Sequence, residues 1–109
     1  MELLKTEFVQ GVPPVLQVYG EIDLSTADQL RAALREALSS DPNVVIDMGG
    51  VTFFDATGLR ALLQVAESRN EAGPPPLINA FRVEWVLDLV GLSGLPSIEV
   101  RGTGDTDGR

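Results

Sequence analysis

The N-terminal quarter of the chain has the hydrophobic pattern of a β-hairpin. Apolar and polar side chains alternate along residues 15–22, which is typical of a strand with one buried face. Residues 3–9 mix apolar and polar side chains without a helical period and are followed by Gly-Val-Pro-Pro at residues 11–14. We therefore expect residues 3–9 to form a strand that turns back and pairs with residues 15–22.

A helix and a buried strand are expected next. Ser25 is a residue type that caps helices, and Asp28 three residues later suits the positive end of the helix dipole. The helix ends near residues 39–42, and the β-branched run at residues 44–46 predicts a strand covered on both faces. The apolar positions that would form the buried face of the helix are Leu30, Leu34, Ala37 and Leu38.

Residues 51–59, Val-Thr-Phe-Phe-Asp-Ala-Thr-Gly-Leu, join an apolar run to a second helix. Asp55 and Thr57 are residue types that begin helices, since their side-chain oxygens accept hydrogen bonds from first-turn N–H groups. We expect Thr57 at the surface of this helix N-terminus, where its hydroxyl could carry a phosphate or one of these two side chains could simply cap the helix. The buried face is predicted at Leu59, Leu62, Leu63 and Ala66, with the helix running to about Ala72.

The C-terminal third predicts two short strands around a third helix. Residues 77–78 and 98–100 are the strands, residues 49–50 a turn before the central stretch, and residues 102–109 a mobile tail without apolar residues. Trp85 and Leu89 form a second apolar stripe on the helix, which we interpret as extra core rather than as a binding surface. The principal buried face is predicted at Val83, Val86, Leu87 and Val90, and Gly91 ends the helix.

These elements predict an α/β fold with the order β-β-α-β-α-β-α-β and a mixed, largely parallel sheet packed against helices. The length of 109 residues fits a single domain over residues 1–101, followed by the tail. Partner and ligand sites in such sheets gather where strands end. Asp23, Asp47 and Asp55 follow predicted strands, so we expect these carboxylates near one rim.

An acidic rim also raises the possibility of a magnesium-dependent phosphoacceptor pocket, with Asp47 as acceptor. Such a pocket needs a pair of acids after the first strand and a lysine near the last strand. The chain has no acidic doublet, and its single lysine is Lys5. The sequence therefore argues against this type of pocket.

Composition narrows the function further. Lys and Arg number 8 against 16 Asp and Glu, so a net charge of −8 disfavours binding to nucleic acid and to anionic membranes. The absence of Cys and His excludes disulfides, thiolate metal sites and catalysis that depends on either residue. No cofactor or metal is expected. The chain begins without a signal-peptide pattern and has no apolar run long enough to span a membrane, which is consistent with a cytoplasmic protein.

Four segments together resemble the STAS domain, specifically the stand-alone anti-sigma factor antagonists. These are Gly20–Asp23, Asn43–Asp47, Asp55–Leu59 and Val86–Leu92, and the resemblance covers residues 3–101 in order. The Asp-x-Ser/Thr-Gly-Leu element after an apolar strand is its most specific part. Many members have two hydroxyl residues before the glycine, whereas Ala56-Thr57 leaves Thr57 as the sole hydroxyl in this loop.

The resemblance implies partner switching. The unmodified antagonist binds an anti-sigma factor, which is also an ATP-dependent serine/threonine kinase, and thereby releases a sigma factor for transcription. The kinase phosphorylates the position of Thr57, and a metal-dependent phosphatase removes the phosphate. The protein would be a binder and a kinase substrate rather than an enzyme. The alternative is a STAS-type ligand-binding or scaffolding module that is not regulated by phosphorylation.

The same resemblance implies which residues face the partner. Thr57 is the candidate phosphorylation site. Asp55 would orient the loop or face the partner, Asp23 would lie at the partner-binding rim or serve in a turn, and Leu59 would reach the core or the partner. The implied partner-binding residues are Asp23, Asp55, Ala56, Thr57, Gly58 and Leu59.

Overall fold

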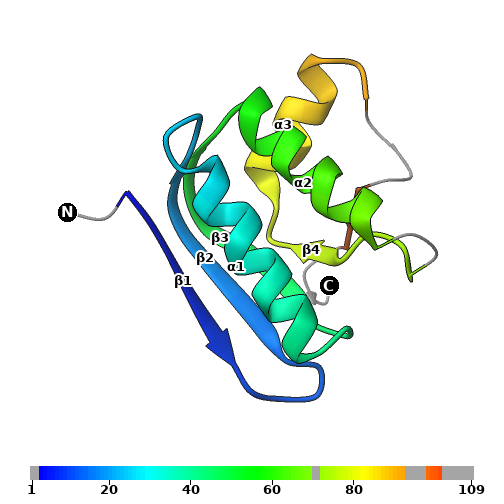
Figure 1. Cartoon of the computed structure of the whole chain (residues 1–109). Helices are drawn as coiled ribbons and strands as arrows, with labels where there is room; N and C mark the ends of the chain where they lie inside the picture. The colour runs from blue at the N-terminus through cyan, green and yellow to red at the C-terminus, as the bar shows by residue number, and fades with distance from the viewer. Residues whose placement is uncertain (1–2, 70–71, 93–97, 102–109) are drawn as a thin grey trace, which may run out of the picture.

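The structure, a computed structural model, describes residues 3–69, 72–92 and 98–101 and has the predicted order of elements (Figure 1). The predicted α/β class and element order are confirmed. Residues 102–109, predicted as a tail, lie outside the described residues. The elements are β1 (Leu4–Val9), β2 (Val15–Ile22), α1 (Ala27–Ser40), β3 (Val45–Phe54), α2 (Ala56–Ser68), β4 (Pro76–Ile78), α3 (Phe81–Leu89) and β5 (Glu99–Val100).

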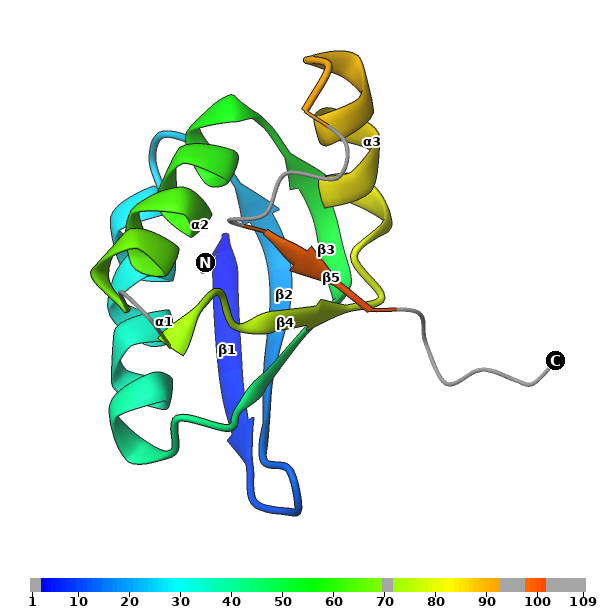
Figure 2. The same ribbon diagram turned by 90° about the vertical axis from the view of Figure 1, so that its right-hand side faces the viewer.

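The five-stranded sheet has the order β1-β2-β3-β4-β5. β1 pairs antiparallel with β2, as expected for the hairpin, and the other neighbours are parallel. Figure 2 shows α1 and α2 together on one side of the sheet and α3 on the other side, near the end of β3. The core lies between the sheet and α1 and α2, because the buried positions of these helices and of β2 face each other there.

β3 is much longer than the predicted strand, because it continues through residues 49–50 instead of turning. Between the pairs Gln17↔Asp47 and Tyr19↔Gly50, β3 contains one more residue than β2, which is a bulge. A Cβ atom on Gly50 would lie 2.3 Å from Cδ1 of Tyr19. Glycine is needed here because the tyrosine ring lies directly over the backbone of β3.

The length of β3 moves Asp47 away from the predicted acidic rim. Asp47 is near the beginning of this strand, where it pairs with Gln17 of β2 and Ile78 of β4. Its Oδ1 accepts hydrogen bonds from Gly49 N at 2.9 Å and from Asn79 Nδ2 at 3.0 Å. The expectation that it shares a rim with Asp23 and Asp55 is therefore wrong, and its carboxylate instead holds the bulge and the loop after β4.

α2 ends at Ser68, several residues before the predicted end at Ala72. The Ser68 hydroxyl donates to the carbonyl of Val65 at 2.8 Å, a local bond that competes with the helical pattern. Arg69 then bridges two chain segments, donating to the carbonyls of Gly73 at 2.8 Å and Pro42 at 3.0 Å. These bonds tie the end of α2 to the start of β3.

α3 packs where β4 leaves β3 unpaired. β4 pairs only with Ile46 and Asp47 of β3, so the rest of that strand edge is open to α3. The buried residues of α3 are Val83, Val86 and Leu87. Trp85 is 63% exposed and Leu89 65% exposed, so the interpretation of this stripe as extra core is wrong. Val90, predicted on the buried face, is half-exposed because α3 ends one residue before it.

Candidate functional site

The candidate site lies where β2 and β3 end side by side. Ile22 and Phe54 are paired neighbours in the parallel sheet, and both are buried. Asp23 and Asp55 are the next residues along the two strands, so the chain leaves the sheet at the same edge in both places. Two of the three carboxylates expected at this rim are therefore brought together there.

Asp55 is the N-cap of α2. Its Oδ1 accepts hydrogen bonds from Thr57 N at 2.9 Å and Gly58 N at 3.3 Å, which satisfies N–H groups that have no partner within the helix. The hydroxyl of Thr57 donates to the same oxygen at 2.5 Å. Of the two capping candidates, Asp55 is thus the cap, and Thr57 is a first-turn residue whose hydroxyl is oriented by the capping carboxylate.

The residues of this loop differ in accessibility. Ala56 is exposed and Thr57 is half-buried, whereas Gly58 and Leu59 are buried. A Cβ atom on Gly58 would lie 2.6 Å from both Cγ2 of Ile22 and Cε1 of Phe54, so the first turn of α2 is seated directly on the ends of the two strands. Ala56 and Thr57 are therefore the accessible residues of this loop, and Gly58 and Leu59 belong to the core beneath them.

Asp23 organises the turn from β2 into α1. Its Oδ1 accepts hydrogen bonds from Ser25 N at 2.9 Å and Ser25 Oγ at 2.6 Å. Thr26, rather than the predicted Ser25, occupies the N-cap position of α1. Its buried hydroxyl donates to the carbonyl of Glu21 at 2.8 Å and accepts from Asp23 N at 3.0 Å, which ties the turn to the end of β2. Asp23 therefore has the turn role foreseen as one of its two alternatives.

The Ser25 hydroxyl donates a hydrogen bond to the Asp23 carboxylate and holds its pKa below the ordinary value. Desolvation opposes this lowering of the pKa, and the backbone N–H groups of Ser25 and Thr26 add to it. Because the pKa of Asp23 is lower in the folded state, charged Asp23 favours folding above its ordinary pKa, and this contribution is lost as pH falls through the folded pKa.

We expect Ser25→Ala to raise the pKa of Asp23, as measured by carbon NMR titration of the carboxyl group. Ser25→Thr, which keeps a hydroxyl, is the control, and an unchanged pKa in Ser25→Ala would contradict the assignment.

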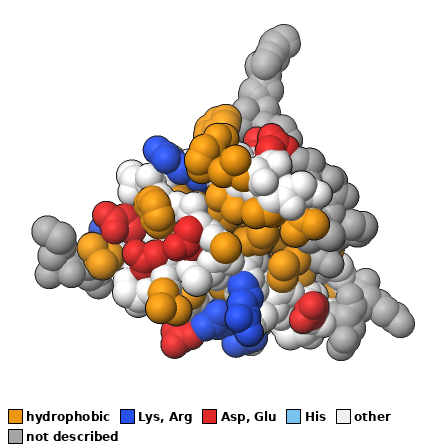
Figure 3. Space-filling view, turned by 90° about the horizontal axis from the view of Figure 1, so that it is seen from above, with side chains coloured by type: hydrophobic (Ala, Val, Ile, Leu, Met, Phe, Trp, Pro, Cys, Tyr) orange, Lys and Arg blue, Asp and Glu red, His pale blue; other side chains and the backbone are white. Residues whose placement is uncertain are grey.

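Leu24 is a rim residue that the sequence reasoning missed. It lies between Asp23 and Ser25 and is 81% exposed. The sequence contained a clue to its exposure. This leucine lies after the alternating strand and before α1, so its apolar side chain belongs to the buried face of neither element. Figure 3 views the end of the molecule where β2 and β3 finish, with acidic side chains on one side and a broad group of hydrophobic side chains beside them. The rim thus offers a partner both charge and apolar area.

The described residues contain no group of three or more carboxylates arranged to hold a metal ion. Within the same residues, no helix is both long and apolar enough to cross a bilayer. This end of the molecule carries acidic, basic and apolar side chains together with one oriented hydroxyl (Figure 3).

Comparison with known families identifies the fold. The family model described as Mlab, STAS domain matches residues 8–98. The chain belongs to the STAS domain family. This STAS domain is 41% identical over 54 residues to the anti-sigma-F factor antagonist RsfB of Mycobacterium tuberculosis, in two strains. That match covers 49% of this chain and 44% of RsfB, so the chain matches less than half the length of these relatives.

Solved structures agree on the STAS fold. An anti-sigma factor antagonist from Mycobacterium paratuberculosis superposes with a TM-score of 0.68 at 24% identity, covering 88% of this chain and 85% of that one. An antisigma-factor antagonist STAS domain from Rhodobacter sphaeroides gives a TM-score of 0.56 at 22% identity, covering 73% of this chain and 90% of that one. This agreement concerns the fold alone.

Proposed function

We propose that this STAS domain is an anti-sigma factor antagonist that binds an anti-sigma factor and thereby releases a sigma factor for transcription. The observation that carries the proposal is the placement of the Asp-x-Thr-Gly-Leu element. Asp55 caps α2 at an accessible rim and orients the Thr57 hydroxyl beside exposed Ala56. The similarity to RsfB, an anti-sigma-F factor antagonist by name, supports the same role.

The proposed binding surface combines acidic and apolar residues. Asp23 and Asp55 would face basic groups of the partner, while Leu24 and Ala56 would supply apolar contacts that exclude water. Gly58 and Leu59 contribute by holding the first turn of α2 in place, since both are buried. The protein acts in this scheme as a binder and a substrate, without catalytic chemistry of its own.

Phosphorylation of Thr57 is the proposed switch. The partner would be an anti-sigma factor serine/threonine kinase that transfers the γ-phosphoryl group of ATP to Oγ1 of Thr57 and releases ADP. A metal-dependent phosphatase would hydrolyse the phosphothreonine, which restores the hydroxyl and releases inorganic phosphate. A phosphate adds about −1.5 to −2 charges. It would lie beside the Asp55 carboxylate, at a rim that already carries Asp23. The added negative charge would then repel a partner surface that is complementary to the unmodified rim.

The test is direct phosphate transfer from ATP. We expect the anti-sigma factor kinase of the same cells to place one phosphate on the wild-type protein, with peptide mass spectrometry assigning it to Thr57. Thr57→Ala should accept none, and Thr57→Ser should accept phosphate at least as fast because serine lacks the β-methyl group that stiffens threonine. Label entering Thr57→Ala at the wild-type rate would refute the site.

A module that is not regulated by phosphorylation remains the competing function, and a cavity under α3 favours it. That cavity, of about 520 Å³, lies apart from Thr57 and has the size of small-molecule sites. Phosphate transfer separates the two functions, because a ligand-binding or scaffolding module would gain no phosphate on Thr57 under conditions in which the kinase is active.

A further inference from the structure

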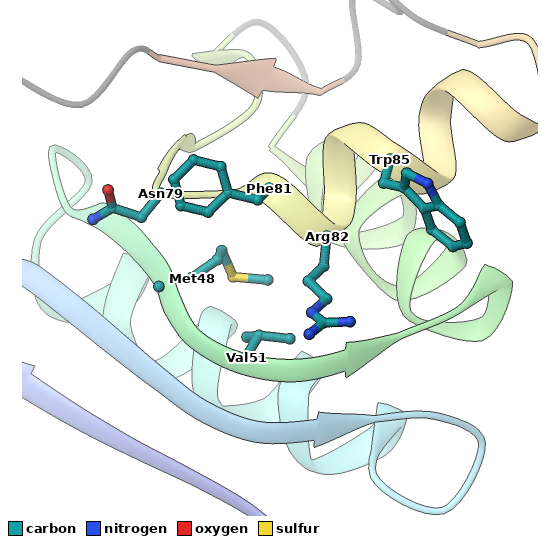
Figure 4. Close-up of a pocket in the computed structure, with 7 residues that line it drawn as sticks. Met48, Val51, Asn79, Phe81, Arg82 and Trp85 are labelled. Atoms are coloured by element: carbon teal, nitrogen blue, oxygen red, sulfur yellow. The ribbon is translucent and has the colours of Figure 1, made fainter.

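A cavity of about 520 Å³ lies between α3 and β3, on the side of the sheet away from α1 and α2. Met48 and Val51 of β3 form its floor, and both are buried. Figure 4 shows Phe81 and Trp85 extending from α3 on either side, with the Arg82 side chain between them pointing toward β3. Gly49 and Asn79 complete the lining, and the Asn79 amide nitrogen donates to Asp47 Oδ1. The cavity thus combines apolar and polar walls with a single cation directed into it.

Arg82 has no partner among the described residues. Within them, no side chain or backbone group forms a hydrogen bond or ion pair with its guanidinium. A second cavity, of about 490 Å³, is lined by Arg69 and Arg101, but these donate to backbone carbonyls and to Glu99, respectively. Only the cavity under α3 therefore combines, among the described residues, a volume suited to a small molecule with an arginine free to bind one.

The helix N-terminus adds little to the attraction for an anion. α3 begins beside the cavity at Phe81, and Ala80 provides no side-chain cap, but Glu84 in the first turn offsets the partial positive charge. The aromatic walls are largely in water, with Phe81 67% and Trp85 63% exposed. A ligand with a flat apolar body would remove that area from water while its charge met Arg82.

We propose that this cavity binds a small organic monoanion, a carboxylate on a flat apolar body. Arg82 would hold the carboxylate through charge-assisted hydrogen bonds, and Phe81 and Trp85 would contact the apolar body above Met48 and Val51. A polyanion is disfavoured, because a single arginine would have to offset several charges on a protein whose net charge is −8. The site is separate from the rim at Thr57 and does not depend on the proposed switch.

Trp85 is the only tryptophan of the chain, so its fluorescence reports directly on this cavity. The experiment titrates the full chain with phenylpropionate and, in parallel, with phenylpropionamide, which has the same shape without the charge. We expect saturable changes in Trp85 emission in the millimolar range, typical of ligands of this size. The acid should bind at least about tenfold more tightly than the amide, since the charge-assisted bond is lost in the amide.

Variants assign the charge effect to Arg82. Arg82→Gln should weaken phenylpropionate binding about tenfold or more, with little effect on binding of the amide. The melting curve should change little, because Arg82 is exposed and forms no bond to the described residues. Arg82→Lys should retain most of the affinity. Arg60→Gln is the matched control, since Arg60 is an exposed arginine of α2 that does not line the cavity.

Several outcomes would overturn the proposal. Equal affinity for acid and amide would remove the role of charge, and an equal loss in Arg60→Gln and Arg82→Gln would show a diffuse effect. A Trp85 signal that changes with protein concentration alone, together with a dimer in sedimentation, would assign this face to a second copy of the chain.

Discussion

Thr57→Asp is expected to weaken anti-sigma factor binding at least about a hundredfold while the domain stays folded. At the rim, the new carboxylate would be buried against the partner beside Asp55 and near Asp23. A charge that is buried in an interface without a partner of opposite sign costs roughly 3–5 kcal/mol of binding free energy. That cost corresponds to two or more powers of ten in the dissociation constant.

The same substitution should leave the free domain folded. It removes the hydrogen bond from the Thr57 hydroxyl to Asp55 Oδ1, worth about 1.5–3 kcal/mol because the acceptor is a carboxylate, and brings two carboxylates together. The helix N-terminus offsets about 0.3–1 kcal/mol of this, and the half-buried position lets the new side chain turn toward water. We expect a lower melting temperature with unfolding still cooperative, since about 1 kcal/mol shifts it by about 4–8 °C in a domain of this size.

Calorimetric titration against the anti-sigma factor separates the effect of the added charge at residue 57 from the effect of its side-chain shape. Thr57→Asn has nearly the same shape as Thr57→Asp without the charge, and it should bind within about tenfold of the wild type. Thr57→Ala should also bind, because it adds no charge to the rim. Equal affinity of wild type and Thr57→Asp would refute the switch, and equal loss in the Asn and Asp variants would assign the effect to side-chain shape.

Much of the fold could be predicted because its signals are local. The strand over residues 15–22 has the predicted bounds, since a strict period of two occurs only where one face is buried. The end of α3 before Gly91 was also predictable. The N–H groups of Gly91 and Leu92 bond back to the carbonyls of Asp88 and Leu87, which is the usual hydrogen-bond pattern of a helix that ends at glycine.

Features that depend on distant contacts could not be predicted in this way. Residues 49–50 have the composition of a turn, but the ring of Tyr19 lies over Gly50 and keeps both glycines within β3. That contact joins residues of neighbouring strands, so the hydrophobic and polar pattern around residues 49–50 gives no indication of it. The displacement of Asp47 from the rim follows from it.

The exposure of Trp85 was unpredictable for a related reason. A second apolar stripe on a helix becomes core only if another layer covers it, and α3 packs on β3 with Val83, Val86 and Leu87 alone. At the candidate site, the sequence indicated that Asp55 and Thr57 meet at a helix N-terminus, and the structure agrees. It did not indicate that Gly58 is a contact point of the core, because residue type alone does not show what lies across the sheet.

Gly58→Ala is expected to destabilise the domain by about 1–3 kcal/mol, against the usual trend for helices. Alanine at a solvent-exposed helix position would stabilise by about 1 kcal/mol relative to glycine. Here the new Cβ would lie 2.6 Å from Ile22 Cγ2 and Phe54 Cε1 and 2.9 Å from Phe54 Cδ1, and both neighbours are buried. Overpacking of this kind typically costs about 1–3 kcal/mol, so the overlap decides the sign.

The overlap with Phe54 provides the control for this prediction. Phe54→Leu shortens the side chain and removes the ring atoms that approach residue 58, so the double variant Gly58→Ala/Phe54→Leu should lose less stability than the sum of the two single variants. Denaturant unfolding of the four proteins gives the coupling free energy directly. Additive losses, or a Gly58→Ala variant as stable as the wild type, would show that α2 can move away from the strands. In that case the first turn that carries Thr57 would not be held by the core, and the rim would be a deformable surface rather than a preformed one.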